Sequence, residues 1–253
     1  TTPRPRRAFR QGHQMVRPVV NRLPNASVVA QELAKDLFDA VRHLLNSQSV
    51  VHIALTGGTV GIASLAECRD QDFASLDLKR LHIWWGDERY VERESLDRNA
   101  VQARNAWLKH LPIPSENVHE FPAQGESTLE TDAKTFNNEF EKASVRFDIM
   151  LMGMGPDGHV ASIFPGKTSG LSEASVVAEP DSPKPPPQRL TFTYKVLNNA
   201  KQIWFTVAGA DKADAVASVF EDVNCTLPAA QVKGKEKTVW YIDQTAASGI
   251  FSC

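Results

Sequence analysis

Two short apolar runs that end abruptly at glycine turns constrain the fold of this chain more than any other feature. Residues 50–55 (VVHIAL) lead into Gly57 and Gly58, and residues 147–152 (FDIMLM) lead into Gly153. Short, continuous apolar runs of this kind are typical of strands that are buried on both faces of a parallel sheet. The two runs therefore predict buried strands that open into glycine loops.

The rest of the chain alternates similar runs with helical periodicity. Further strands are predicted over residues 16–21, 81–85, 190–194, 202–208 and 238–242, and helices over residues 27–46, 62–68, 98–111, 128–143 and 211–219. Residues 166–189 have no clear period and contain several prolines, which predicts a long irregular loop. Alternating strands and helices favour a doubly wound, three-layer α/β/α Rossmann-like sheet. We expect residues 16–253 to form a single domain.

In sheets of this type, ligands bind beyond the carboxyl ends of the strands. The predicted strands place four stretches at that rim of the sheet: residues 56–61, 86–91, 153–159 and 209–212. Functional residues should therefore be sought first in these four stretches.

Charge excludes some classes of partner. The 253 residues carry a formal net charge of −2, which does not suit a general binder of nucleic acid or of membranes. Only the first residues depart from this balance, because Arg4, Arg6, Arg7 and Arg10 form a local basic cluster. We expect residues 1–15 to be a disordered tail rather than a binding arm.

Cysteine usage and hydropathy indicate the compartment. Cys68, Cys225 and Cys253 are odd in number and far apart, so neither a disulfide framework nor a structural zinc site is expected. No apolar stretch approaches the roughly 20 residues that a membrane-spanning helix needs. We therefore expect a cytoplasmic protein without a membrane partner.

The second glycine loop matches the dinucleotide-binding pattern G-x-G-x-x-G at Gly153, Gly155 and Gly158. The match fails in context, because Pro156 removes a backbone donor and Pro165 ends any helix that starts here. We interpret the glycines instead as a turn that presents Asp157 and His159 at the rim. Histidine titrates near neutral pH and suits general base catalysis, although a purely structural histidine is the alternative.

The first glycine loop, Thr56-Gly57-Gly58-Thr59, lies between a predicted strand and a predicted helix. Backbone N–H groups at such a helix start bind anions, with help from the helix dipole. No Lys-Ser/Thr pair follows, so a single phosphate group fits better than a nucleoside triphosphate. Arg89 and Lys212 are predicted at the same rim and would support the phosphate.

Taken together, these segments resemble the 6-phosphogluconolactonases. The resemblance covers residues 16–247 and rests on residues 56–59 (TGGT), 85–91 (WGDERYV), 97–99 (DRN), 153–166 (GMGPDGHVASIFPG), 181–191 (DSPKPPPQRLT), 209–213 (GADKA) and 227–230 (LPAA). It implies hydrolysis of 6-phosphoglucono-1,5-lactone to 6-phosphogluconate, the second step of the pentose phosphate pathway. It also implies a fold shared with glucosamine-6-phosphate deaminases and ribose-5-phosphate isomerases, and neither a metal nor another cofactor.

Within this resemblance each candidate residue has an expected role. His159 would take a proton from water, and Asp157 would either orient the imidazole or bind a substrate hydroxyl. Residues 56–59, Arg89 and Lys212 would anchor the phosphate, and Arg189 would hold either the phosphate or the oxygens of the sugar acid. We expect the enzyme to act as a monomer.

Two other functions fit the same fold. Glucosamine-6-phosphate deaminases resemble this chain around residues 157–159 but carry an acidic residue five positions after the histidine, where this chain has Phe164. A non-enzymatic sugar-phosphate sensor would need a DNA-binding appendage, for which the basic tail is too short. The sequence therefore favours the lactonase.

Overall fold

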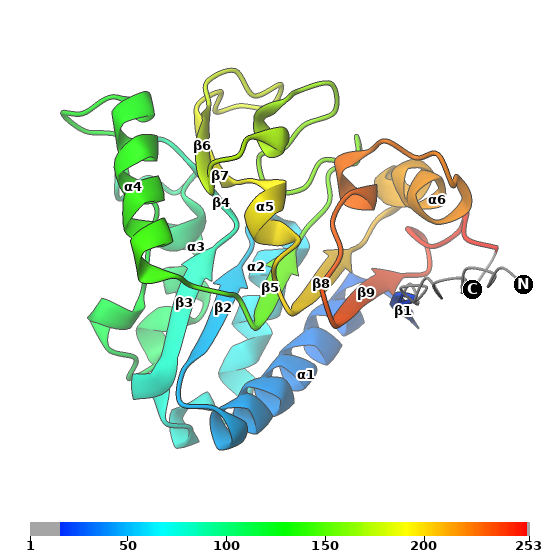
Figure 1. The fold of residues 1–253 in the computed structure, drawn as a ribbon. Coiled ribbons are helices and arrows are strands. Elements are labelled where there is room, and N and C mark those ends of the chain that lie inside the picture. Colours follow the sequence, from blue (N-terminus) through cyan, green and yellow to red (C-terminus); the bar gives the residue numbers. More distant parts are fainter. Residues whose placement is uncertain (1–15, 252–253) are drawn as a thin grey trace, which may run out of the picture.

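The computed structural model describes residues 16–251, and a six-stranded sheet forms its centre (Figure 1). All neighbouring strands in this sheet are parallel. The strand order is β1-β9-β8-β5-β2-β3. The bounds of these strands are β1 Val19–Leu23, β2 Val51–Leu55, β3 Leu81–Trp85, β5 Ile149–Met152, β8 Gln202–Val207 and β9 Lys237–Asp243.

The path of the chain confirms the doubly wound sheet. From β2 the chain moves outward to β3, and it then returns to the other side of β2 to form β5, β8 and β9. The direction of winding thus reverses between β2 and β5. Their carboxyl ends carry the two glycine loops, and such a reversal point is where open α/β sheets bind ligands.

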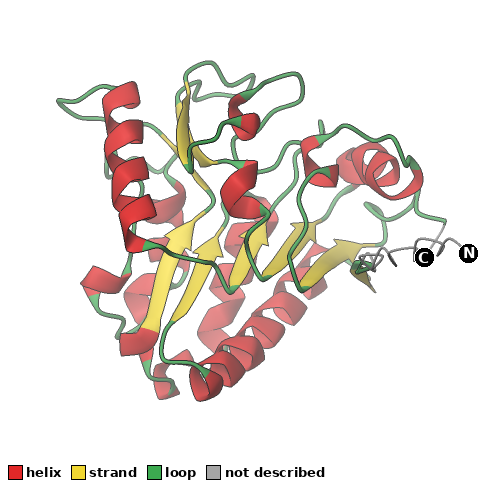
Figure 2. Ribbon diagram, in the orientation of Figure 1, coloured by secondary structure: helices red, strands yellow, loops and turns green. Residues whose placement is uncertain are grey.

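Helices fill the connections between strands (Figure 2). Their bounds are α1 Ala26–Ser47, α2 Thr59–Glu67, α3 Asn99–Ala106, α4 Leu129–Ala143, α5 Tyr194–Leu197 and α6 Ala213–Glu221. The Asn25 side chain caps α1 by accepting a hydrogen bond from the Val28 amide, and asparagine is among the residues preferred at this position. The predicted helix over residues 98–111 is too long, because α3 ends at Ala106 and a separate 3₁₀ turn follows at Leu108–His110.

A second, antiparallel sheet is the main departure from the prediction. It has three strands in the order β4-β7-β6, namely Asp87–Arg89, Arg189–Phe192 and Val176–Glu179. The strand predicted near residue 190 belongs to this sheet and not to the parallel one. Strand β6 lies within the region predicted to be irregular. It is not predicted because its four residues are too few to show a period in the sequence. Gly86 alone separates β3 from β4, so the small sheet continues beyond the rim.

Buried aromatic side chains fix the small sheet to the rest of the fold. Phe192 of β7 contacts the rings of Phe121, Phe140 and Phe147, with centroid distances of 5.2, 4.7 and 5.5 Å. All four side chains are buried. Full burial of a phenylalanine stabilises a fold by about 1.5–3 kcal/mol. The residues that β4 and β7 carry at the rim are therefore held on a firmly packed support.

Several expectations are not tested by this fold. The basic tail at residues 1–15 and Cys253 lie outside the described residues. The single domain and the monomeric state stay predictions. Among residues 16–251, no helix is both long enough and apolar enough to cross a membrane.

Candidate active site

A cavity of about 560 Å³ opens at the carboxyl ends of β2, β5 and β8 and is bounded by residues of the small sheet. Its lining includes every predicted site residue except Asp157: Thr56, Gly57, Gly58, Thr59, Arg89, His159, Arg189 and Lys212. A hollow of about 600 Å³ beside α4 and α5 contains none of them. The chemistry of the lining, rather than volume, therefore assigns the site.

The first glycine loop forms the turn that the sequence predicts. Gly58 takes a φ of +83° and immediately precedes α2, which begins at Thr59. That φ favours glycine, because a side chain would strain the backbone there. A Cβ atom on Gly57 would lie 2.0 Å from Oδ1 of Asn99, so this loop and the start of α3 are in close contact. The amides of the first turn of α2 are thus presented at the cavity, as an anion site requires.

The second glycine loop brings its histidine and aspartate together. The distance from His159 Nδ1 to Asp157 Oδ1 is 2.5 Å, and the same oxygen accepts the His159 backbone N–H at 3.1 Å. A Cβ atom on Gly155 would lie 2.0 Å from His159 Nδ1, so glycine is needed for the ring to sit there. Because the aspartate accepts a hydrogen bond from the Nδ1–H group, the lone pair of the neutral ring is on Nε2.

Burial and charge act in opposite directions on this pair. Burial lowers the pKa of His159 below its usual value, while the hydrogen bond and charge of Asp157 oppose the shift. Burial raises the pKa of Asp157, but the hydrogen bond and charge of His159 outweigh burial and leave that pKa below its usual range. The result at neutral pH is an ionised carboxylate beside a neutral imidazole, which is the form a general base needs.

Two of the predicted cations line the cavity with their side chains already anchored. Arg89 Nη1 donates to the backbone oxygen of Asp97 at 2.8 Å. Lys212 Nζ donates to the backbone oxygen of Met154 at 2.7 Å, and burial lowers its pKa. Each keeps further N–H groups for an anion, since a guanidinium has five donors and an ammonium has three.

Arg189 also lines the cavity, and its guanidinium makes several hydrogen bonds within the protein. Its Nε donates to the Pro186 oxygen at 2.8 Å, and Nη2 donates to the oxygens of Lys184 and Pro185 at 3.1 and 3.3 Å. These bonds hold the proline-rich loop, residues 183–187, against the cavity. A direct role in binding substrate stays a prediction for this arginine.

Sequence reasoning missed several polar residues of the lining, among them Asp87, Asn99 and Lys184. Asp87 Oδ2 accepts a hydrogen bond of 2.6 Å from Ser162 Oγ, and Asn99 Nδ2 donates to the Asp87 backbone oxygen at 3.1 Å. These three residues lie in segments that carry the family resemblance, and Asp87 lies in the rim stretch 86–91. Its partner Ser162 is 75 residues away, so the local sequence does not show the contact.

Within the described part of the chain, no group of three or more histidine, cysteine, aspartate or glutamate side chains is arranged to hold a metal ion. The polar groups of the cavity include cations, hydroxyls, amides, the carboxylates of Asp87, Asp211 and Asp243, and His159 with its partner Asp157. This combination suits a substrate that carries both an anionic group and a bond that water can attack.

Comparisons with known proteins agree with this geometry. The family model described as glucosamine-6-phosphate isomerases/6-phosphogluconolactonase matches residues 24–240. The 6-phosphogluconolactonase of Mycobacterium tuberculosis is 36% identical over 236 residues, which cover 89% of this chain and 95% of that protein. The crystal structure of the Thermotoga maritima 6-phosphogluconolactonase has a TM-score of 0.81 and 28% identity, and the match covers 90% of this chain and 100% of that one.

A monomeric glucosamine-6-phosphate deaminase of the NagB superfamily shares the fold as well. Its TM-score is 0.76 at 18% identity, and the match covers 92% of this chain and 100% of that one. At this identity the likeness concerns the fold alone.

Proposed function

The chain belongs to the family of glucosamine-6-phosphate isomerases and 6-phosphogluconolactonases, and from that membership we propose a mechanism in which His159 activates water to open a sugar lactone. The protein is an enzyme of the 6-phosphogluconolactonase type, a hydrolase that acts on a sugar lactone. Its reaction is the hydrolysis of 6-phosphoglucono-1,5-lactone to 6-phosphogluconate in the pentose phosphate pathway.

One observation carries the mechanism: the His159–Asp157 pair lies at a cavity whose lining also includes Arg89, Lys212 and the first glycine loop. Nε2 of His159 takes a proton from water as the water oxygen bonds to the lactone carbonyl carbon. The tetrahedral intermediate then collapses, and the bond from that carbon to the ring oxygen breaks. The imidazolium returns its proton to the departing ring oxygen, and the new carboxylic acid ionises in solution.

Asp157 has a defined part in these steps. Its carboxylate accepts the hydrogen bond from the Nδ1–H group, so Nε2 is the basic nitrogen throughout the attack. The same negative charge stabilises the imidazolium that forms in the transition state. This arrangement favours an orienting role for Asp157 over contact with a substrate hydroxyl, because the oxygen that faces the ring also accepts the His159 amide.

The phosphate of the substrate occupies the other side of the cavity in this proposal. Residues 56–59 offer backbone amides and two hydroxyls, and Arg89 and Lys212 supply positive charge. Hydrogen bonds to a charged group contribute about 1.5–3 kcal/mol each, so these groups would supply most of the substrate affinity. Arg189 acts chiefly by holding the proline-rich loop over the bound lactone.

The histidine's neighbour argues against deamination. Phe164 stands where deaminases carry an acidic residue, and its ring lies 4.6 Å from the His159 ring, measured between centroids. Phe164 is buried and cannot exchange protons. Ring opening of an amino sugar needs such a group, whereas lactone hydrolysis does not.

Replacing His159 with alanine tests the mechanism directly. Loss of a positioned general base should lower kcat roughly 10²–10⁴-fold, with a smaller change in KM. The measurement is the rate of lactone hydrolysis above the spontaneous rate, using freshly made 6-phosphoglucono-1,5-lactone. A kcat near that of the wild type, in a variant with an unchanged melting temperature, would show that another group activates the water.

A further inference from the structure

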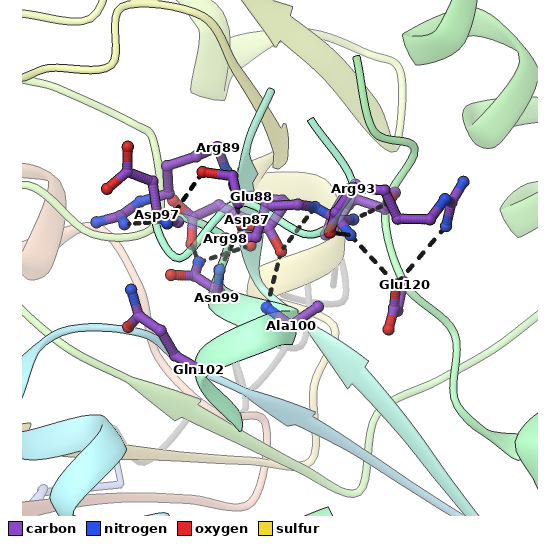
Figure 3. Close-up of polar contacts among 12 residues, drawn as sticks. Asp87, Glu88, Arg89, Arg93, Asp97, Arg98, Asn99, Ala100, Gln102 and Glu120 are labelled. Atoms are coloured by element: carbon purple, nitrogen blue, oxygen red, sulfur yellow. Dashed lines mark hydrogen bonds and ion pairs between the residues drawn. The ribbon is translucent and has the colours of Figure 1, made fainter. Parts of the chain in front are cut away.

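A buried carboxylate lies directly behind the rim and joins two segments of the site (Figure 3). Oε1 of Glu88 accepts hydrogen bonds from the backbone N–H of Arg89 at 2.8 Å and of Asn99 at 2.7 Å. Oε2 accepts the backbone N–H of Ala100 at 3.0 Å. One side chain therefore ties strand β4 to the first turn of α3, and it caps that helix from outside.

The charge of Glu88 is balanced by an arginine that is equally buried. Arg98 Nε lies 3.9 Å from Glu88 Oε2, and both side chains are almost fully excluded from solvent. Burial raises the pKa of Glu88 to about 7, while Arg98 and the three amide donors stabilise the charged form. Removing one member of a buried pair leaves the other uncompensated, so the two act as a unit.

Arg98 also fixes the segment that precedes α3. Nη1 donates to the Arg93 oxygen at 3.0 Å and to Glu120 Oε2 at 3.3 Å, and Nη2 donates to the Phe121 oxygen at 2.7 Å. These bonds set the course of residues 93–97. That segment ends at Asp97, whose backbone oxygen accepts the guanidinium of Arg89.

Glu88 and Arg98 thus both fix the position of Arg89. Glu88 holds its backbone N–H, and the segment that Arg98 pins holds its guanidinium. Glu88 also fixes Asn99, whose side chain is packed against Gly57 of the first glycine loop. The distance between Arg89 and residues 56–59 is consequently set by the Glu88–Arg98 pair, although neither residue lines the cavity.

We propose that Glu88 and Arg98 are positioning residues for the substrate phosphate: they hold Arg89 and the first glycine loop in fixed positions relative to each other, so that both can bind the phosphate group. This inference rests on the proposed function, which assigns the phosphate to Arg89 and residues 56–59. The pair touches no reacting atom. Its loss therefore weakens affinity for the phosphorylated substrate and product, and it changes the chemical step much less.

The test compares Glu88→Gln with Arg89→Ala in the full-length enzyme. For each variant, KM, kcat and the inhibition constant of the product 6-phosphogluconate are measured. Arg89→Ala should raise KM and the inhibition constant roughly 10–100-fold, the range expected for lost hydrogen bonds to a charged group. Glu88→Gln should raise both roughly tenfold, and the two effects should combine less than multiplicatively in the double variant, because part of the Glu88 effect acts through Arg89.

Asp148→Asn provides a matched control. Asp148 is also a buried carboxylate with three donors, but it lies at the opposite end of the sheet. Its replacement should lower the melting temperature and leave KM and the inhibition constant unchanged. A merely structural role for Glu88 would make Glu88→Gln behave in the same way.

The possible outcomes separate the two proposals. If Arg89→Ala changes neither constant, the phosphate role of Arg89 in the proposed function is wrong. If Arg89→Ala changes both but Glu88→Gln lowers only kcat or adds fully to Arg89→Ala, the positioning role is wrong. If Glu88→Gln does not fold, Glu120→Gln takes its place, because Glu120 is a partly exposed partner of Arg98. It should raise both constants about two- to threefold, and an unchanged KM would overturn the inference.

Discussion

Histidine side chains lie at both ends of the parallel sheet, but their partners differ between the two ends. At the carboxyl ends of the strands, His159 pairs with a carboxylate beside a cavity lined by cations. At the amino ends, His52, His82 and His119 form a histidine cluster whose members contact other rings. His82 Nδ1 lies 2.8 Å from His119 Nε2, and Trp84 Nε1 donates to His52 Nδ1 at 3.1 Å.

The pKa values express this difference. Burial, together with the neighbouring His82, lowers the pKa of His52 and of His119 to about 4. Burial also lowers the pKa of His159, but Asp157 opposes the shift. A histidine that must accept a proton during a reaction needs such a carboxylate, whereas a packed histidine is best left neutral. The partner, rather than the ring, distinguishes a catalytic histidine from a structural one.

Among the predictions from this comparison, the largest effect should come from removing the charge of Asp157, which leaves His159 without a carboxylate partner, like the histidines of the cluster. Asp157→Asn keeps a hydrogen-bond acceptor but removes the charge that stabilises the imidazolium, so kcat should fall roughly 10–100-fold. The acid limb of the kcat/KM profile should also move. In the wild type it lies below pH 6.5, because burial lowers the pKa of His159. In the variant it should lie lower still, because Asp157 raises that pKa. An acid limb that moves upward would contradict the assigned pairing.

A smaller effect concerns stability in acid. His52 and His119 have a folded pKa of about 4 and an unfolded value near 6.5. The unfolded chain therefore binds more protons between these values, and stability falls as the pH drops from 6.5 towards 4. Replacing both with glutamine should recover on the order of 1–2 kcal/mol at pH 4.5 relative to pH 7.5, after allowance for solvent screening.

Denaturant titrations at the two pH values measure this difference. The quantity to compare is the change in unfolding free energy between pH 7.5 and pH 4.5. Glutamine also alters packing, but it does so equally at both pH values, so this effect cancels in the difference. An identical pH dependence in the variant and the wild type would show that the cluster is not the group that titrates.

The smallest effect should be on the rate at neutral pH. His119→Gln removes a ring that stacks on Trp84 with a centroid distance of 4.0 Å, far from the cavity lining. Turnover of the phosphorylated lactone should stay within about twofold of the wild type, as expected for a substitution away from the site. A large loss of kcat would mean that the two ends of the sheet are coupled.

The sequence predicts the parallel sheet well because the residues of each strand themselves carry the pattern that indicates a strand. The runs before Gly57 and Gly153 are apolar except for His52 and Asp148, and the glycines mark where they end. The loops that present residues 56–59 and His159 follow from the same signals. Helix starts are also local, as the Asn25 cap shows.

The small sheet could not be predicted in this way. Strand β4 is Asp87-Glu88-Arg89, three charged residues that suggest an exposed loop by any local rule. Asp87 and Glu88 are buried because β7, which is distant in the sequence, pairs with this strand and because Arg98 neutralises Glu88. The direction of the Arg189 guanidinium depends instead on the carbonyl groups of a nearby loop without a sequence period. Long-range strand pairing decides the first case, and the backbone path of an irregular loop decides the second.

The turn that carries His159 closes on itself. The Gly155 amide donates to the His159 oxygen at 3.0 Å, the Gly158 amide donates to the Gly155 oxygen at 2.9 Å, and Asp157 binds both the amide and the ring of His159. Hydrogen bonds within residues 155–159 thus orient the ring of His159, the base of the proposed mechanism, and the Phe164 ring packs against it at a centroid distance of 4.6 Å. If this turn were grafted after another buried parallel strand, it would carry the aspartate and the hydrogen bonds that set the tautomer and the orientation of the histidine ring.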